Sequence, residues 1–316
     1  MRTLLAVALI LLSLSANAQS WPSKPLRYIV PFPPGAFNDA LARIMSAELP
    51  KYLGQPVIVE NKPGGNTIIG TEAAMKSPPD GYTLFGAALP FSVIQSLYKL
   101  SFDVTKDFTP ITLAGTTPNL LVANTNVPVN SVKELIAAAK AKPGGLNYAS
   151  TGNGSSNHLS FELFKAMTGT QITHIPYKGS APAVTDLIAG QVQLMFDNTP
   201  NVLPHVKAGK IKALAISSKK RSALAPDVPT VDEAGVPGYD VTVWFGILAP
   251  AGTPKEIVQR LNTEMVKVMR TPEVMDRFQK AGVDTVASSP EEFASFLKGE
   301  VARWAKVVQD ANIKAD

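Results

Sequence analysis

The 316-residue chain contains no cysteine. This absence excludes disulfide frameworks, thiolate zinc sites, iron–sulfur clusters and cysteine nucleophiles. Histidine is also scarce, because only His158, His174 and His205 occur. Their spacing matches neither H-E-x-x-H nor another metal-ligand pattern, so structural or surface roles are expected for all three. The sequence therefore predicts no metal and no cofactor.

Neither sign of charge dominates the chain. The 30 Lys and Arg residues stand against 25 Asp and Glu, and the net charge of +5 is spread along the sequence. The densest basic run, Lys219–Arg221, has no aromatic residues interleaved with it. This pattern favours a solvated turn, and no nucleic-acid partner is expected.

Long hydrophobic runs are absent except at the N-terminus. Leu4–Leu14 is almost continuously apolar, follows Arg2 and precedes the small-x-small site Ala16–Ala18. The run is shorter than the ~20 residues of a membrane span. Residues 1–20 are therefore predicted to be a secretory signal peptide, and the mature chain is expected in a bacterial periplasm. An uncleaved membrane anchor is the alternative interpretation.

Proline and glycine are plentiful, with 26 and 22 residues, and are scattered as turn signals between apolar segments. Helices are predicted from Asn38 or Asp39, over 67–76, from the Ser131 capping box to Gly144, and after the 151–156 loop. Buried strands are predicted at 26–32, 57–60, 82–86, 146–150, 172–177, 194–197 and 211–217. This alternation is typical of a mostly parallel sheet with helices on both faces.

The last seventy residues change character. Hydroxyl residues followed by proline, at Thr253, Thr271 and Ser289, predict three helix starts with side-chain caps. Two earlier segments, 108–126 and roughly 227–250, lack helical patterns and are interpreted as extended crossings.

Two crossings predict two α/β lobes joined by two crossover segments, with a ligand cleft between the lobes. Residues 21–122 and 248–316 are assigned to lobe 1, and residues 123–247 to lobe 2. In open α/β sheets, ligands bind outside the carboxyl ends of the strands. The loops expected to face the cleft are 33–38, 63–67, 151–156 and 178–182.

Two of these loops indicate an anion site. Gly35 and Gly154 each stand between a strand and a helix, where backbone N–H groups and the helix dipole can hold a carboxylate or phosphate. Neither loop carries a P-loop lysine, and Gly152–Asn157 only approximates G-x-G-x-x-G because Asn157 replaces the third glycine. A tight turn is the alternative for each glycine, but their pairing across two lobes favours anion binding.

The same loops do not predict a catalyst. G-x-S-x-G does not occur, and Ser155 or Ser156 with His158 forms only a local pair at a helix start, where serine commonly caps the helix. We therefore expect a binding protein and not an enzyme. His158 is retained as a candidate ligand neighbour.

Acidic and aromatic side chains also lie near the predicted cleft. Asp39 is expected to cap a helix, since its charge would repel an anionic ligand. Asp197 ends an apolar strand, where it either binds a donor on the ligand or orders adjacent loops. Phe37, Phe91 and Trp244 are candidates for the pocket lining, although core packing is the stronger expectation for Trp244 and the weaker one for Phe37.

A series of short motifs runs along the mature chain: Trp21–Pro25, Val30–Gly35, Asp39–Arg43, Gly54–Val57, Glu60–Gly64, Pro79–Leu84, Pro176–Gly179, Asp186–Val192 and Ala249–Pro254. They resemble, in the same order, motifs of the Bug proteins, the solute-binding receptors of tripartite tricarboxylate transporters. The resemblance implies a two-lobed α/β periplasmic binding protein, type II-like, with two Rossmann-like lobes. It also implies a monomer that closes on a small carboxylate and delivers it to a permease of one large and one small membrane subunit.

The resemblance further implies where the carboxylate is held, partly through ordered water. The implied contacts are Pro34, Gly35, Ala36, Phe37, Asn38, Asp39, Thr151, Asn153, Ser155, Ser156, His158, Lys178, Gly179, Ala181 and Asp197.

The first loop departs from the family pattern. The family usually has a second glycine after Gly35, whereas Ala36–Asn38 stands here. We hypothesise that Phe37 shortens the pocket or stacks on a flat ligand, which favours an aromatic carboxylate over an aliphatic di- or tricarboxylate. Two other functions stay open: a sensory receptor that passes its closed form to a signalling partner, and an exported α/β hydrolase.

Overall fold

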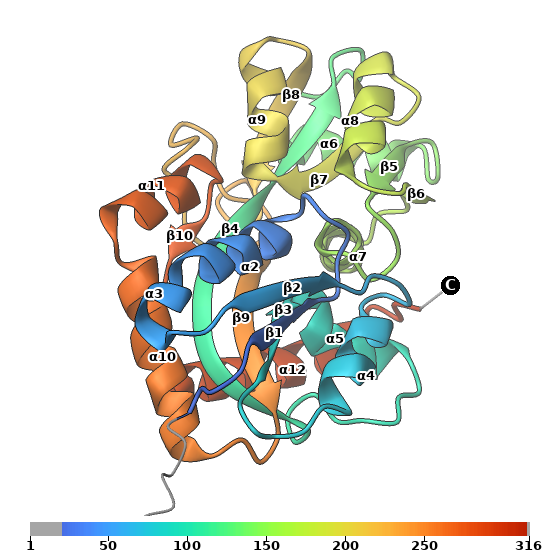
Figure 1. Ribbon diagram of the computed structural model, residues 1–316. Helices are drawn as coiled ribbons and strands as arrows, with labels where there is room; N and C mark the ends of the chain where they lie inside the picture. The colour runs from blue at the N-terminus through green and yellow to red at the C-terminus, as the bar shows by residue number, and fades with distance from the viewer. Residues whose placement is uncertain (1–20, 315–316) are drawn as a thin grey trace, which may run out of the picture.

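The computed structural model describes residues 21–314, so the predicted signal peptide lies outside the described residues. Helices and strands alternate along the chain (Figure 1). The strands are β1 Leu26–Val30, β2 Val57–Asn61, β3 Thr83–Ala88, β4 Phe108–Asn124, β5 Asn147–Ser150, β6 Thr173–Pro176, β7 Leu194–Asn198, β8 Ile211–Ile216, β9 Thr242–Pro250 and β10 Asp284–Thr285. The helices are α2 Phe37–Glu48, α3 Pro50–Leu53, α4 Ile68–Met75, α5 Leu89–Leu97, α6 Val132–Ala141, α7 Ser156–Thr168, α8 Ser180–Ala189, α9 Thr199–Lys207, α10 Lys255–Met269, α11 Pro272–Lys280 and α12 Pro290–Asp310.

The same three-strand unit occurs twice. In the first unit, β1 lies between β2 and β3, all parallel, and each strand leads into a helix: α2, α4 and α5. In the second unit, β5 lies between β6 and β7, again parallel, and the strands lead into α7, α8 and α9. In both units the third strand pairs antiparallel with a crossing strand, which is β9 in the first and β4 in the second.

Strand β4 joins the two units. Its first part, Phe108–Pro118, pairs with β9, and its second part, Asn119–Asn124, pairs with β7 and β8. Figure 1 shows β4 as one long curved strand that runs from the lower lobe into the upper one. The two segments that lack a helical pattern thus contain the strands β4 and β9, as the sequence predicts.

The prediction of a mostly parallel sheet is wrong. Every pairing that involves β4 or β9 is antiparallel, so antiparallel pairs outnumber parallel ones in the described sheet. Apolar runs show that a strand is buried, but they carry no information about its direction. Helices do cover both faces: in β3, Phe85 packs on Phe91 of α5, whereas the next residue, Gly86, faces Asn38 of α2.

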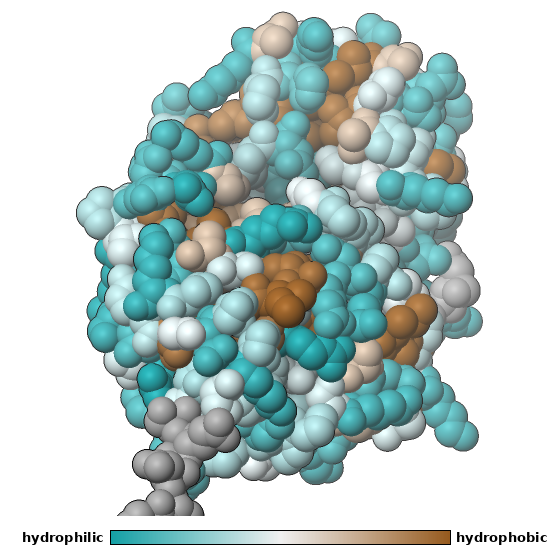
Figure 2. Space-filling model, in the orientation of Figure 1, coloured by the Kyte–Doolittle hydropathy of each residue, from teal (hydrophilic) through white to brown (hydrophobic). Residues whose placement is uncertain are grey.

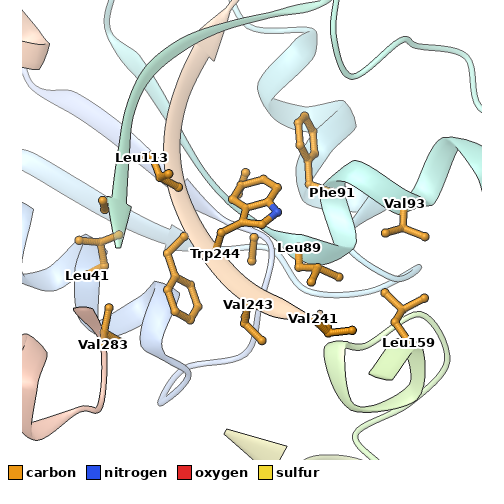
Figure 3. Packing of buried hydrophobic residues seen from close by; sticks show 14 of the residues in the cluster. Leu41, Leu89, Phe91, Val93, Leu113, Leu159, Val241, Val243, Trp244 and Val283 are labelled. Atoms are coloured by element: carbon orange, nitrogen blue, oxygen red, sulfur yellow. The ribbon is translucent and has the colours of Figure 1, made fainter. Parts of the chain in front are cut away.

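The candidate pocket residues Phe91 and Trp244 belong to the core. Trp244 is fully buried and packs against Phe293 and Phe296 of α12, and Figure 3 shows it among apolar side chains. Phe91 is 1% exposed and packs against Phe85 and Phe108. Full burial of an aromatic side chain contributes about 1.5–3 kcal/mol to folding, so these rings hold the lobe together and do not line a pocket.

Two of the three helix N-caps predicted in the last seventy residues are confirmed. The side chains of Thr271 and Ser289 accept hydrogen bonds from the first turns of α11 and α12. Thr253 does not cap α10, which starts one residue later than expected, and its hydroxyl instead donates to Pro250 O.

No helix in the described range combines the length and apolarity of a bilayer span. The face in Figure 2 is largely hydrophilic, with apolar side chains in small separate groups.

Candidate ligand site between the lobes

Six strand-to-helix turns form the candidate site, three in each lobe. Each turn follows the carboxyl end of a parallel strand and opens a helix, namely α2, α4 and α5 in one lobe and α7, α8 and α9 in the other. The first N–H groups of a helix have no acceptor within it, and the helix dipole is positive there. Four of the six turns are the loops predicted to face the cleft. The sequence did not indicate the turn at Ala88 before α5, and of the turn before α9 it indicated only Asp197.

The two sets of turns meet at Gly154 and Asn66. Gly154 precedes α7 and has a φ of +70°, and a Cβ atom built on it would overlap Nδ2 of Asn66 in the turn before α4. The loops after β5 and β2, far apart in sequence, are therefore in van der Waals contact. This contact brings together helix N-termini from both lobes.

Asp39 stabilises the first loop from within. Its carboxylate accepts hydrogen bonds from the backbone N–H of Gly35, from Arg43 and from Asn61. Burial acts to raise its pKa, but the hydrogen bonds from Arg43, Asn61 and Gly35 outweigh this effect and hold the pKa below the ordinary aspartate value. The oxygens are thus occupied by protein donors, which leaves them little capacity for a ligand.

The expected helix cap at Asn38 or Asp39 is wrong. The helix starts earlier, at Phe37, with Ala36 as an N-cap that provides no side-chain bond. Asn38 and Asp39 therefore lie inside the first turn, where both are buried. The N–H groups of Phe37 and Asn38 have no acceptor within the helix. Pro34, Gly35 and Ala36 are exposed at this end of α2.

The side chain of Phe37 packs against the core of its lobe. Its ring lies 4.5 Å from the ring of Phe245 and 5.3 Å from that of Phe278, measured between centroids, and it is partly buried against the core. Phe37 is less buried than Trp244, as expected, but it does not lie in the loop: it is the first residue of α2, which directs its ring toward β9 and α11. Selection of an aromatic ligand by Phe37 stays a prediction.

Asp197 is the centre of a buried network in the other lobe. It is 2% exposed and accepts hydrogen bonds from Asn157, Asn201, Ser180 and the backbone N–H of Asn198. Burial raises the pKa of this carboxyl, although the four hydrogen bonds act in the opposite direction. Asp197 thus ties together the starts of α7, α8 and α9. Of its two expected roles, the contacts match the ordering of adjacent loops.

Other predicted residues surround the start of α7. Ser155 is its N-cap and accepts the backbone N–H of His158, as expected of a capping serine, and Ser156 is the first helical residue. His158 is buried, and its Nδ1 accepts the backbone N–H of Gly154. Thr151 donates to Asn157, which connects its loop to the Asp197 network. These contacts are structural and do not build a nucleophile.

The remaining predicted residues lie on two other turns. Asn153 is partly buried, one residue before Gly154. Gly179 is the N-cap of α8 and has a φ of +121°, a conformation that favours glycine. Lys178 and Ala181, on either side of it, are exposed.

The structure also brings together polar groups whose proximity the sequence does not indicate. Ser150 Oγ lies 2.6 Å from His174 Nε2, but Ser150 is fully buried and also accepts the N–H of Gly152, so it is not presented as a nucleophile. The Tyr28 hydroxyl and Asn38 Oδ1 flank Gly86 and have no hydrogen-bond partner within residues 21–314. A tyrosine within an apolar strand gives no signal of this placement. Within the same range, no three potential metal-ligating side chains converge.

Comparison with known proteins identifies the family. Residues 41–313 match the model of the tripartite tricarboxylate transporter family receptor. The chain belongs to this receptor family. Among curated proteins it is 40% identical to Protein BugT of Bordetella pertussis over 301 residues, which are 94% of this chain and 92% of that protein.

Solved structures of the family share the fold. The structure of R. palustris Rpa4515 with adipate is 38% identical, with a TM-score of 0.83 over 93% of this chain and 99% of that one. MatC from Rhodopseudomonas palustris with bound malate is 33% identical, with a TM-score of 0.81 over 91% and 100% of the two chains. The protein therefore has the α/β fold of these periplasmic binding proteins, and its family is one of receptors.

Proposed function

We propose that the protein is a periplasmic receptor that binds a small carboxylate between its two lobes and delivers it to a tripartite tricarboxylate-type membrane transporter. The main support is the meeting of helix N-termini from both lobes at Gly154 and Asn66. Protein donors occupy the nearby carboxylates of Asp39 and Asp197, so the helix N–H groups are the available partners for an anion. Two family members with bound adipate and malate support this ligand class.

We further propose that the chain moves as two lobes after export and removal of residues 1–20. The sequence predicts their boundaries at 122/123 and 247/248, whereas the strand pairing supports boundaries at Pro118/Asn119 within β4 and just before β9 at Thr242. A ligand that bridges N–H groups of both lobes binds the closed arrangement better than the open one, and so shifts the population toward closure. Release to the permease follows when the lobes reopen. The mechanism is binding and movement, without a chemical step.

A pair of proline variants tests the anion site. Ser156→Pro removes one free N–H at the first position of α7, and the preceding residue, Ser155, already has the extended conformation that proline requires (φ −66°, ψ 161°). A hydrogen bond to a charged group contributes about 1.5–3 kcal/mol. We therefore expect Ser156→Pro to weaken binding of adipate or malate by about tenfold or more in calorimetric titration.

Lys255→Pro is the matched control. It makes the same change at the first position of α10, where Lys255 is exposed and Pro254 is also extended (φ −55°, ψ 137°). Its affinity is expected to equal that of the unchanged protein. Equal losses in both variants would contradict a role for the start of α7, and a protein that binds no carboxylate in a broad panel would refute the proposed function.

A further inference from the structure

The turn between β2 and α4 has an unusual backbone. Asn66 and Thr67 have positive φ angles of 49° and 75°. Asparagine tolerates this left-handed region, but a β-branched residue such as threonine is strained in it. Backbone strain of this kind persists where the surroundings impose it, and it is common at ligand-binding positions.

The same two side chains have buried polar atoms without partners. Thr67 is 5% exposed, and its Oγ1 makes no hydrogen bond within the described part of the chain, even to the helix that it caps. Nδ2 of Asn66 is likewise buried and unpaired within that part. Desolvated polar groups are costly unless a partner satisfies them. This strained turn therefore has two polar groups that are available to a partner from outside the described chain.

The position of the turn indicates what that partner is. The amide of Asn66 lies against Gly154, next to the start of α7 in the other lobe. An amide nitrogen only donates hydrogen bonds, and a threonine hydroxyl donates readily. Both groups are neutral, so they suit an oxygen of the ligand that accepts hydrogen bonds, in addition to the carboxylate held at helix N-termini.

We propose that Asn66 and Thr67 are specificity-determining residues that select ligands with a second oxygen-bearing group, either another carboxylate or a hydroxyl. This inference rests on the proposed function, since it concerns the same site. It predicts that the protein discriminates against a simple monocarboxylate of the same chain length.

The experiment uses calorimetric titration of the mature protein with two matched pairs of acids. Adipate against hexanoate tests the second carboxylate, and malate against succinate tests the hydroxyl. Asn66→Gly and Thr67→Gly remove the side chains and also relieve the positive φ, so neither variant is expected to unfold the protein. Asn312→Gly is the control, because Asn312 has the same φ of 49° but is exposed beyond α12.

We expect the unchanged protein to prefer the second-oxygen ligand of at least one pair, and each glycine variant at 66 or 67 to reduce that preference about tenfold, in line with one lost hydrogen bond. Asn312→Gly should keep the preference. Equal binding within both pairs, or a preference unchanged in both site variants, would overturn the inference while the proposed function stands. If the unchanged protein binds none of the four acids, the proposed function fails as well.

Discussion

The two buried aspartates show how single residues can order the loops of the candidate site. Asp39 holds the Gly35 turn, and Asp197 holds the starts of three helices in the other lobe. In each case an acidic side chain near an anion site is neutralised or satisfied by protein donors. At Asp39 the ion pair with Arg43 offsets the repulsion that an unpaired carboxylate would exert on an anion. The donors to Asp197 are neutral, so they orient its carboxyl group without cancelling a charge.

Replacement of Asp39 should have a pH-dependent effect on stability. The folded-state pKa of Asp39 is lowered, so its contribution to stability is present above the unfolded-state pKa of about 3.9 and is lost as the pH falls through the folded-state value. Asp39→Asn should therefore reduce the free energy of unfolding by about 1–2 kcal/mol at pH 7. Urea unfolding should show this difference shrinking below about pH 4.

Asp310→Asn provides the comparison, because Asp310 forms an exposed ion pair with Lys306. Such pairs contribute roughly 0–1 kcal/mol, so little change is expected at any pH. A stability difference for Asp39→Asn that stays constant from pH 7 to pH 3 would show that the charge of Asp39 is not what stabilises the loop.

The contacts of a single residue can be predicted from the sequence only where its hydrogen-bond partner is near in the chain. Ser155, Thr271 and Ser289 cap helices whose first turns follow them directly, and the sequence indicated all three. The contact of Asn66 with Gly154 and the clustering of Tyr28 with Asn38 depend on tertiary packing. No spacing rule links those positions, so these contacts cannot be predicted from the sequence.

At the scale of elements, the junction of the β2–α4 and β5–α7 turns depends on the absence of a side chain at Gly154. Gly154→Ala should place a methyl group against the Asn66 amide and also strain the backbone at a φ of +70°. We expect at least a tenfold loss of carboxylate affinity in calorimetric titration, because closure of the lobes is impeded.

Two further variants separate the effect of backbone strain on affinity from the effect of the steric contact with Asn66. Gly169→Ala carries a similar φ, +64°, but no atom lies within 4 Å of the added Cβ, so it shows the effect of backbone strain alone. Asn66→Gly combined with Gly154→Ala removes the steric conflict and should recover part of the lobe closure. If Gly169→Ala and Gly154→Ala reduce affinity equally, the contact between the turns is not important for binding.

Elements with a regular apolar period can be predicted from the sequence, and so can the parallel pairing within each three-strand unit, whereas the antiparallel pairing of β4 and β9 cannot. Strands such as β1 and β7 and helices such as α2 and α7 follow from apolar runs and helical spacing. Helix α5 was missed because Leu89–Leu97 begins directly after β3, with no turn residues to separate them. The antiparallel pairing of β4 and β9 depends on how the chain returns between lobes, which is a long-range property.

At the scale of the whole molecule, the two three-strand units form two similar halves that face each other. Strand β4 belongs to both halves. In each half, helices begin at the carboxyl ends of the parallel strands, and the turn before α7 contacts the turn before α4 of the other half at Gly154 and Asn66. In the proposed function, a ligand between the halves contacts both of them, so its binding energy can be coupled to their relative position. The proposed transport role depends on this coupling, since a permease must distinguish loaded from empty receptors.

The absence of cysteine makes this coupling directly measurable, because introduced cysteines are the only sites for a spin label. Lys51→Cys on α3 and Lys207→Cys on α9 place one label on each lobe at exposed positions. Pulsed dipolar spectroscopy should show a shorter and narrower distance distribution at saturating adipate or malate. The control pair Lys51→Cys and Lys280→Cys lies within one lobe and should not respond. Unchanged distances between the lobes, with binding verified by calorimetry, would contradict closure as the mechanism.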